Sequence, residues 1–483
     1  MVVLLVSNEN LIDYVYAKQR ETQRLSKIKL ENIHNPRFMF YTIKDEIDNF
    51  IDSNGEYYNR FIMIPGLRGV GKTTILYQIY NYLISYKKIN NKYILYIDVS
   101  DLLSFYDTDI NNVFNLFLER IHQTTIVDLD EKIFLFVDEA QLDKNWALYA
   151  KLIFDKSFNV FMIFTGSSAL DLEVNTDATR RLIRHPLYPC NFQEYLLLKH
   201  NLNLSSNNFK YLIYRGDKKT VEEAIKCEIK IKDNFTFLNN DLKLEFKKFL
   251  FSQGFPFALS NSEEDIYRLI NDVVKKIIYK DLNNFKHFKN VTPIMISQIV
   301  TYLAIKKPGD TSNVKIAQSL GISSKTVASI LDILELSQLI FSVNAYGSAG
   351  KMLKKPKEHF FLTPSIKTAI NYNLGRYNIR NDNCFAVLAE NLVASIFHKL
   401  SCEAMSSLAL FYDPKKKGVD FLVKHIDRVI PVEVGIGKKT KSQLTIAMNR
   451  YDADFGILVS NRTDSIKMID NVIYIPLHLF ALI

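Results

Sequence analysis

The stretch FIMIPGLRGVGKTT, Phe61 to Thr74, decides the fold of this chain. It reads as a short apolar strand that runs into a glycine-rich loop and then into a helix. Its central part fits the pattern G-x-x-x-x-G-K-[ST], in which glycines let successive backbone N–H groups point at one anion. Lys72 is placed to reach the phosphates of a nucleoside triphosphate, and the Thr73 hydroxyl to ligate Mg²⁺. A chance glycine-rich turn is the alternative, and the strand–loop–helix context disfavours it. The predicted phosphate-binding residues are Gly66, Arg68, Gly69, Val70, Gly71, Lys72, Thr73 and Thr74.

The composition is that of a soluble globular protein. The chain has 483 residues, 48% of them hydrophobic and 23% charged, which is enough for about three domains. A formal charge of +9 and a pI near 9.0 allow a nucleic-acid partner, although a lysine-rich proteome would give the same excess. The four cysteines have no metal-ligand spacing and fit free thiols in a reducing cytosol. We expect a cytoplasmic protein with no membrane span.

Apolar runs alternate with helical patterns on both sides of this loop. The runs Tyr93–Val99, Ile133–Val137 and Val160–Phe164 are strand-like, with amphipathic segments between them. This alternation predicts βαβ units and a parallel sheet covered on both faces. Ligands of such sheets bind beyond the carboxyl ends of the strands, where the phosphate loop and the residues after each apolar run would meet.

Two acids follow the third strand-like run. Asp138 can hold Mg²⁺, and Glu139 can orient and deprotonate an attacking water. The alternative is a pair of acids in a surface turn. Thr165, after the next run, is a candidate sensor of the γ-phosphate or the water, or a simple turn residue. The run RRLIR at 180–184 could supply an arginine finger, in cis or across a subunit boundary, or be a solvated helix end.

Residues 313 to 336 have a helix–turn–helix pattern. Asn313–Leu320 is followed by Gly321 in the turn, and Ser323 can cap a second helix at Ser324–Leu336. Lys325 at the start of this helix could reach DNA, or the unit could be a packing module. Nearer the C-terminus, Asp420 and Glu433 on two strands and Glu390 on a preceding helix could form a carboxylate cluster that holds Mg²⁺, or be the acidic ends of half-buried elements.

In this order the parts resemble the prokaryotic, largely archaeal, P-loop ATPases of the AAA/STAND-like class. The resemblance covers about residues 35 to 483, and it rests on GLRGVGKTT, FLFVDEAQ, FTGSS, RHPLYPCNFQEYL, GFP, KGVDFLV and IPVEVG. It implies an α/β fold with a P-loop NTPase parallel sheet, a helical lid, a winged helix and a C-terminal restriction-endonuclease-like α/β domain of the PD-(D/E)xK type. After a helical N-terminal lead-in at 1–58, the expected segments are the P-loop ATPase core at 59–196, the helical lid at 197–290, the winged helix-turn-helix at 291–346 and the nuclease-like domain at 347–483.

The resemblance also implies roles for individual residues. Arg181 best matches the arginine that acts at the γ-phosphate, and Gly254 and Pro256 match a turn on the adenine side of the nucleotide. The nuclease-like motif departs from its pattern, because Gly435 stands where a lysine is expected and Lys438 would have to replace it.

The leading hypothesis is therefore an Mg²⁺-dependent ATPase that switches DNA-associated C-terminal domains. The alternatives are an ATP-gated DNA nuclease and a STAND-like signalling scaffold that forms homo-oligomers on binding ATP.

Overall fold

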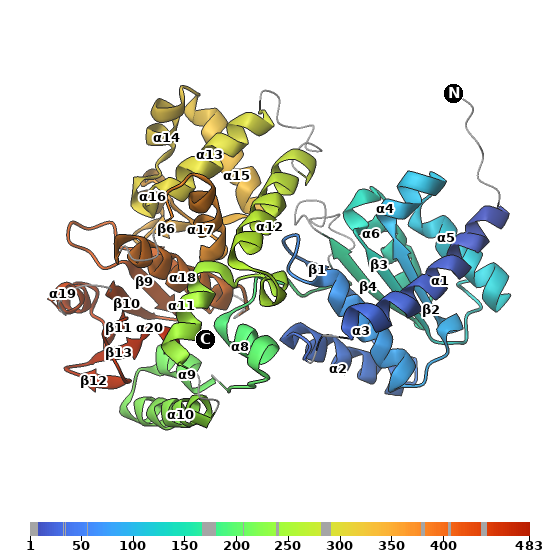
Figure 1. Ribbon diagram of the computed structural model, residues 1–483, viewed down its shortest axis with the longest axis horizontal. Helices are drawn as coiled ribbons and strands as arrows, with labels where there is room; N and C mark the ends of the chain where they lie inside the picture. The colour runs from blue at the N-terminus through green and yellow to red at the C-terminus, as the bar shows by residue number, and fades with distance from the viewer. Residues whose placement is uncertain are drawn as a thin grey trace. The chain divides into compact units, whose positions relative to one another are not determined.

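The computed structural model describes residues 8–31, 33, 35–55, 57–166, 180–205, 207–237, 241–281, 291–377, 382–403, 407–435 and 442–483. The chain divides into two compact units, Met1–Tyr188 and Pro189–Ile483 (Figure 1). The phosphate loop lies in the first unit, and the predicted helix–turn–helix and carboxylate cluster lie in the second. Each unit is described by itself.

The first unit contains a five-stranded parallel sheet with the strand order β2-β3-β4-β1-β5. The sheet confirms the predicted α/β class, and the three apolar runs are strands within one or two residues of their predicted ends. Strands β1, β3 and β4 are buried along their whole length, as expected for central strands of a sheet covered on both faces. The strand bounds are β1 Phe61–Pro65, β2 Ile94–Asp98, β3 Ile133–Asp138, β4 Val160–Gly166 and β5 Ile183–Arg184.

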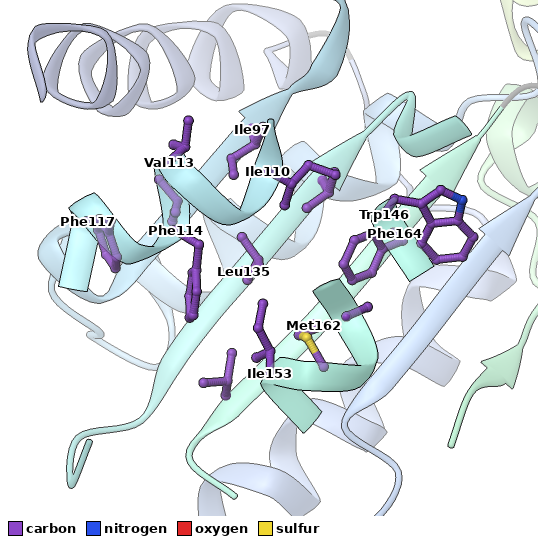
Figure 2. Packing of buried hydrophobic residues seen from close by; sticks show 14 of the residues in the cluster. Ile97, Ile110, Val113, Phe114, Phe117, Leu135, Trp146, Ile153, Met162 and Phe164 are labelled. Atoms are coloured by element: carbon purple, nitrogen blue, oxygen red, sulfur yellow. The ribbon is translucent and has the colours of Figure 1, made fainter. Parts of the chain in front are cut away.

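Helices cover both faces of this sheet. On one face, Leu135 and Met162 of the sheet lie under Phe114 and Ile153 of α5 and α6 (Figure 2). On the other face, Phe50 of α2 packs against Phe134 and Phe161, with ring centroids 5.7 and 5.3 Å apart. The helix bounds are α1 Asn8–Leu30, α2 Phe38–Asp52, α3 Lys72–Ser85, α4 Val99–Asp101, α5 Ile110–Phe117 and α6 Trp146–Lys156.

The second unit is built on an eight-stranded mixed sheet with the order β12-β13-β11-β10-β9-β8-β6-β7. Strand β6 pairs in parallel with β8 and antiparallel with β7, so the hairpin that follows the helix–turn–helix is part of the C-terminal sheet. The strand bounds are β6 Ile340–Ala345, β7 Glu358–Phe361, β8 Leu408–Tyr412, β9 Phe421–His425, β10 Arg428–Gly435, β11 Gly456–Ser460, β12 Lys467–Ile469 and β13 Val472–Pro476.

The helix–turn–helix begins and ends where the sequence predicts. Helices α14 (Asn313–Leu320) and α15 (Ser324–Leu336) are joined through Gly321 at φ 66°, and the Ser323 hydroxyl accepts the Thr326 N–H at 3.0 Å. The other helices are α8 Phe192–His200, α9 Asn207–Arg215, α10 Lys218–Phe237, α11 Leu242–Ser252, α12 Glu263–Lys276, α13 Pro293–Ile305, α16 Ala349–Lys354, α17 Pro364–Asn373, α18 Asp382–Glu403, α19 Ser442–Tyr451 and α20 Leu477–Phe480.

Helix α18 is the one helix in the described ranges that is long and apolar enough to cross a membrane. Half of its most apolar window is buried within the fold, and the helix packs against β8, β10 and α17. A central helix of a folded domain has the same composition, and these contacts are those of such a helix.

Candidate active site

The phosphate loop joins β1 to α3 at the carboxyl edge of the sheet. Gly69 and Gly71 have φ angles of 80° and 99°, a region that residues with a Cβ rarely adopt. Helix α3 begins at Lys72, so its first N–H groups lack helical partners and face the loop. The Lys72 ammonium group donates to the carbonyls of Gly66 and Leu67 at 2.8 and 2.9 Å, which holds its charge over the loop.

A clamp that the sequence did not reveal fixes this loop from outside. Arg37, 6% exposed, donates to the Val70 carbonyl at 2.7 Å and to the Tyr188 carbonyl at 2.9 Å. The segment after β5 runs beside β1, and a Cβ on Gly66 would lie 2.3 Å from the Leu187 carbonyl oxygen. The first glycine of the loop is therefore required by close packing. Arg37 directly precedes α2, a whole helix before β1, and no sequence pattern marks its contact with the loop.

Asp138 lies beside the loop, although β4 separates its strand from β1. Its carboxylate is 2.7 Å from the Thr73 hydroxyl, which comes from 65 residues away in the sequence. The buried Thr165 hydroxyl donates to the other carboxylate oxygen, as does the Glu139 N–H at 3.1 Å. The structure thus brings Thr73, Asp138 and Thr165 together. Thr165 is a hydrogen-bond donor to Asp138 in this structure. Its predicted contact with the γ-phosphate stays a prediction.

Glu139 has a left-handed backbone conformation, with φ 54° and ψ 40°. Residues other than glycine adopt it at a cost of order 1 kcal/mol or more, and such residues cluster at functional sites. The Glu139 carboxylate lies 3.6 Å from the Arg68 guanidinium of the phosphate loop and accepts the Gln141 amide N–H at 2.5 Å. The predicted base therefore lies at the same edge as the loop.

Tyr96 is a second residue that the sequence analysis missed. Its hydroxyl donates to Asp138 at 3.0 Å, and its ring stacks on Tyr77 of α3 with centroids 5.6 Å apart. Burial and, secondly, the charge of Asp138 raise the pKa of Tyr96 well above its usual range, so it remains a donor. Burial likewise raises the pKa of Asp98, which lies next to Asp138 across the β2–β3 pair. The signal for Tyr96 was a hydroxyl within an otherwise apolar strand.

Arg181 is not at this edge. Strand β5 pairs with β1 in the register Ile62–Ile183, which places Arg181 beside Arg60, before β1 begins. Six extended residues separate Arg60 from Gly66, about 20 Å of chain. Arg181 instead donates to Asp155 at 2.5 Å, at the end of α6. Arg181 thus lies away from the phosphate loop of its own chain, and its action at the γ-phosphate, in cis or across a subunit boundary, stays a prediction.

Pro256 and Gly254 belong to the second unit. Pro256 begins a short 3₁₀ helix, Pro256–Ser260. A Cβ on Gly254 would lie 2.4 Å from the Thr363 hydroxyl oxygen, so local packing accounts for this glycine. A role on the adenine side stays a prediction.

The predicted three-carboxylate metal site is not formed. Asp420 and Glu433 are neighbours: the Asp420 N–H donates to Glu433 at 3.2 Å, and Asp420 accepts the Val434 N–H at 2.7 Å. Glu390 does not join them, and its charge acts on the buried Lys367. Within the described ranges, no group of three or more His, Cys, Asp or Glu side chains could hold a metal ion. Lys438 lies outside the described residues.

The comparisons with known proteins agree with the geometry of the first unit. Residues 58–196 match the model of an AAA domain, and residues 243–371 match a domain of unknown function (DUF8612). The uncharacterized protein MJ1637 of Methanocaldococcus jannaschii is 32% identical over 454 residues, which cover 94% of this chain and 90% of that protein. A second protein of that organism, MJ1544, is 26% identical over 308 residues, 62% of this chain and 60% of its own length.

Among solved structures, the Walker-type ATPase PABY2304 of Pyrococcus abyssi aligns with a TM-score of 0.38 and 14% identity, over 69% of this chain and 94% of that one. Independently of that alignment, the match to the AAA model and the geometry of the phosphate loop identify residues 58–196 as a P-loop domain of the AAA type.

Proposed function

The chain belongs to the same family as protein MJ1637 of Methanocaldococcus jannaschii, and we propose that it is an Mg²⁺-dependent ATPase whose own residues assemble the hydrolysis site in the first unit. The observation that carries this proposal is the 2.7 Å approach of the Thr73 hydroxyl to the Asp138 carboxylate, next to the phosphate loop. Two strands that are not neighbours bring these oxygens together at one edge of the sheet.

The residues fit a magnesium ion and a triphosphate. Hydroxyl and carboxylate oxygens are the ligands that Mg²⁺ prefers, and Thr73 and Asp138 supply one of each. Residues 66 to 74 supply positive φ angles, helix N-terminal N–H groups and the Lys72 ammonium, which together suit an anion. Bound Mg²⁺ would neutralise charge on the phosphate oxygens.

Glu139 is the proposed general base. Its carboxylate takes a proton from water as the water oxygen bonds to the γ-phosphorus, and the bond from that phosphorus to the bridging oxygen breaks, leaving ADP. Arg68 and Gln141 fix the carboxylate from two sides. Lys72 stabilises the charge that develops on the phosphates.

Two variants test this proposal, each with a matched surface control. Lys72→Ala should abolish tight ATP binding, whereas the exposed Lys156→Ala on α6 should leave it unchanged. Glu139→Gln should retain ATP binding in an equilibrium assay and reduce turnover by at least 100-fold, whereas the exposed Glu119→Gln should be active. Turnover by Glu139→Gln at the parent rate would refute the assignment of the base.

We further propose that hydrolysis repositions a DNA-associated second unit. The supporting observation is the capped helix α15, which follows a tight glycine turn and has the exposed Lys325 as its second residue. If Arg181 acts, it acts in a homo-oligomer, because β5 holds it away from the phosphate loop of its own chain. Size measurement with a non-hydrolysable ATP analogue tests the role of Arg181 in a homo-oligomer. A chain that stayed monomeric with ATP analogue, with ADP and without nucleotide would exclude that role.

A further inference from the structure

Two lysine runs far apart in the sequence meet in the second unit. Lys354, Lys355 and Lys357 lie in the connection between β6 and β7, and Lys415, Lys416 and Lys417 lie in the turn between β8 and β9. All six are exposed. We refer to these six residues as the lysine surface.

The pairing of β6 with β8 brings the runs together. Ala345 is in register with Tyr412, and the Tyr346 N–H donates to the Tyr412 carbonyl at 3.0 Å. The Tyr412 hydroxyl then donates to the Pro356 carbonyl at 2.6 Å. Pro356 lies between Lys355 and Lys357, and Lys415 follows Tyr412 by three residues. One backbone hydrogen bond and the Tyr412 hydroxyl therefore hold the two connections next to each other.

The second run stands on a turn built around one buried acid. The Asp413 side chain has no exposed area, and its carboxylate accepts the Lys415 N–H at 3.1 Å and the Tyr451 hydroxyl at 2.7 Å. It is also paired with Arg450 at 3.2 Å. A Cβ on Gly418 would lie 2.6 Å from the carboxyl carbon, so only glycine fits there. The lysines are thus presented by a fixed turn.

Nearby acids only partly offset this charge. Asp413 is already paired with Arg450, and Glu335 lies 4.0 Å from Lys357. Burial, with the charge of Asp420 in second place, raises the pKa of Glu358 to about 7, so this carboxyl carries a reduced charge near neutral pH. Lysine is common in this chain, and scattered surface lysines would need no explanation. Six that are held together at like charge repel one another, and a polyanion would relieve that repulsion.

We propose that the lysine surface binds the phosphate backbone of double-stranded DNA. The inference rests on the DNA-association part of the proposed function, since α15 lies just before β6 in the same unit. Phosphate contacts of this kind position a duplex without reading its sequence. Their signature is a steep dependence of affinity on salt, because each neutralised phosphate releases counterions.

The experiment compares three triple variants of the full-length chain. Lys415, Lys416 and Lys417 are changed to Gln in one variant, and Lys354, Lys355 and Lys357 in another. The control variant changes the exposed Lys218, Lys219 and Lys226 of α10 to Gln. Binding of a labelled 30-base-pair duplex is measured by fluorescence anisotropy from about 50 to 200 mM salt, the range over which such contacts lose most affinity.

Each lysine-surface variant should make the negative slope of the log association constant against log salt concentration shallower by about 2 to 3. Each should also weaken binding at least tenfold at about 100 mM salt. The control should shift the slope by less than about 1. Equal effects of all three variants would overturn the proposal, as would duplex binding that none of them changes. Binding to phosphatidylserine vesicles with the same lysine dependence, and none to DNA, would overturn it too. Nucleotide binding and turnover without DNA should be unchanged in every variant, so loss of ATPase activity would test the first unit alone.

Discussion

The phenol of Tyr96 offers a test of how Asp138, the proposed magnesium ligand, is positioned. Tyr96→Phe removes one oxygen from a side chain that is 3% exposed and leaves its stacking on Tyr77 intact. The lost bond, 3.0 Å long, has a carboxylate acceptor, and such bonds contribute about 1.5–3 kcal/mol. Asp138 would retain Thr73, Thr165 and its own backbone contact, so the fold should persist while the carboxylate is oriented less firmly.

The assay is the ATPase rate as a function of free Mg²⁺ at saturating ATP. Removing a partner of a metal ligand weakens metal affinity about 10–100-fold, which corresponds to about 1.4–2.8 kcal/mol and agrees with the value of the bond. The Mg²⁺ midpoint should therefore rise by that factor, while the rate at saturating Mg²⁺ falls by much less.

Tyr80→Phe is the matched control. It removes another buried hydroxyl bond, the 2.8 Å contact to Asn91, from helix α3 of the same unit. Tyr80→Phe should lose less thermal stability than Tyr96→Phe, because its acceptor is a neutral amide oxygen, and only Tyr96→Phe should shift the Mg²⁺ midpoint. If Tyr96→Phe lowered the melting temperature with an unchanged midpoint, its hydroxyl would be structural and the reasoning would fail.

Three further substitutions test other contacts. Arg37→Ala leaves the two carbonyls that Arg37 binds in the phosphate-loop clamp without this donor. It should lower the free energy of unfolding in urea by about 2–4 kcal/mol and also weaken ATP binding, and Arg37→Lys should recover both in part. In wild type, the folded-state pKa of Glu358 is raised from 4.5 to about 7, so the folded chain binds more protons than the unfolded one and stability falls as pH rises through that window. Glu358→Gln should remove up to about 3 kcal/mol of this decline, and identical urea midpoints for both proteins at pH 5 and pH 7.5 would contradict it. Gly254→Ala should cost about 1–3 kcal/mol by overpacking against the hydroxyls of Thr363 and Ser365, which would lie 2.4 and 2.6 Å from the new Cβ. Thr363→Ala in the same chain should restore only part of this loss, and adding Ser365→Ala should restore more.

Much of the first unit could be predicted because its signals are local. The buried strands are continuous apolar runs, and the loop glycines carry the positive φ angles that their pattern requires. Since all strands are parallel, residues that follow strand ends must share one edge, and the convergence of Thr73 and Asp138 follows from that alone. Contacts made through side-chain reach could not be predicted. Arg37 is 33 residues from Val70, and no periodicity marks which arginine bends back onto the loop.

In the second unit too, features with a local sequence signal could be predicted, and contacts between distant elements could not. Helix bounds set by capping and turn residues were predicted correctly, because Ser323 and Gly321 act on their immediate neighbours. The prediction of a carboxylate cluster was wrong because it required side chains from three separate elements to converge on one point. Asp420 and Glu433 meet through strand pairing, whereas Glu390 lies on a helix whose rotation about its axis the sequence does not give.

Arg181 shows how strand register decides a role that proximity in the sequence cannot. The segment after it forms only a two-residue strand, without the apolar run that marks the others. Its alignment is set by tertiary hydrogen bonds, since the amides of His185 and Leu187 donate to Met63 and Pro65. A residue that precedes a parallel strand lies at the amino edge, and one that follows it lies at the carboxyl edge. Arg181 precedes β5, so its guanidinium lies near the amino edge and contacts Asp155. Leu187 follows β5, so its carbonyl lies at the carboxyl edge and packs against Gly66 of the phosphate loop. Action of Arg181 on the γ-phosphate across a subunit boundary therefore stays a prediction, which the size measurement with a non-hydrolysable ATP analogue tests.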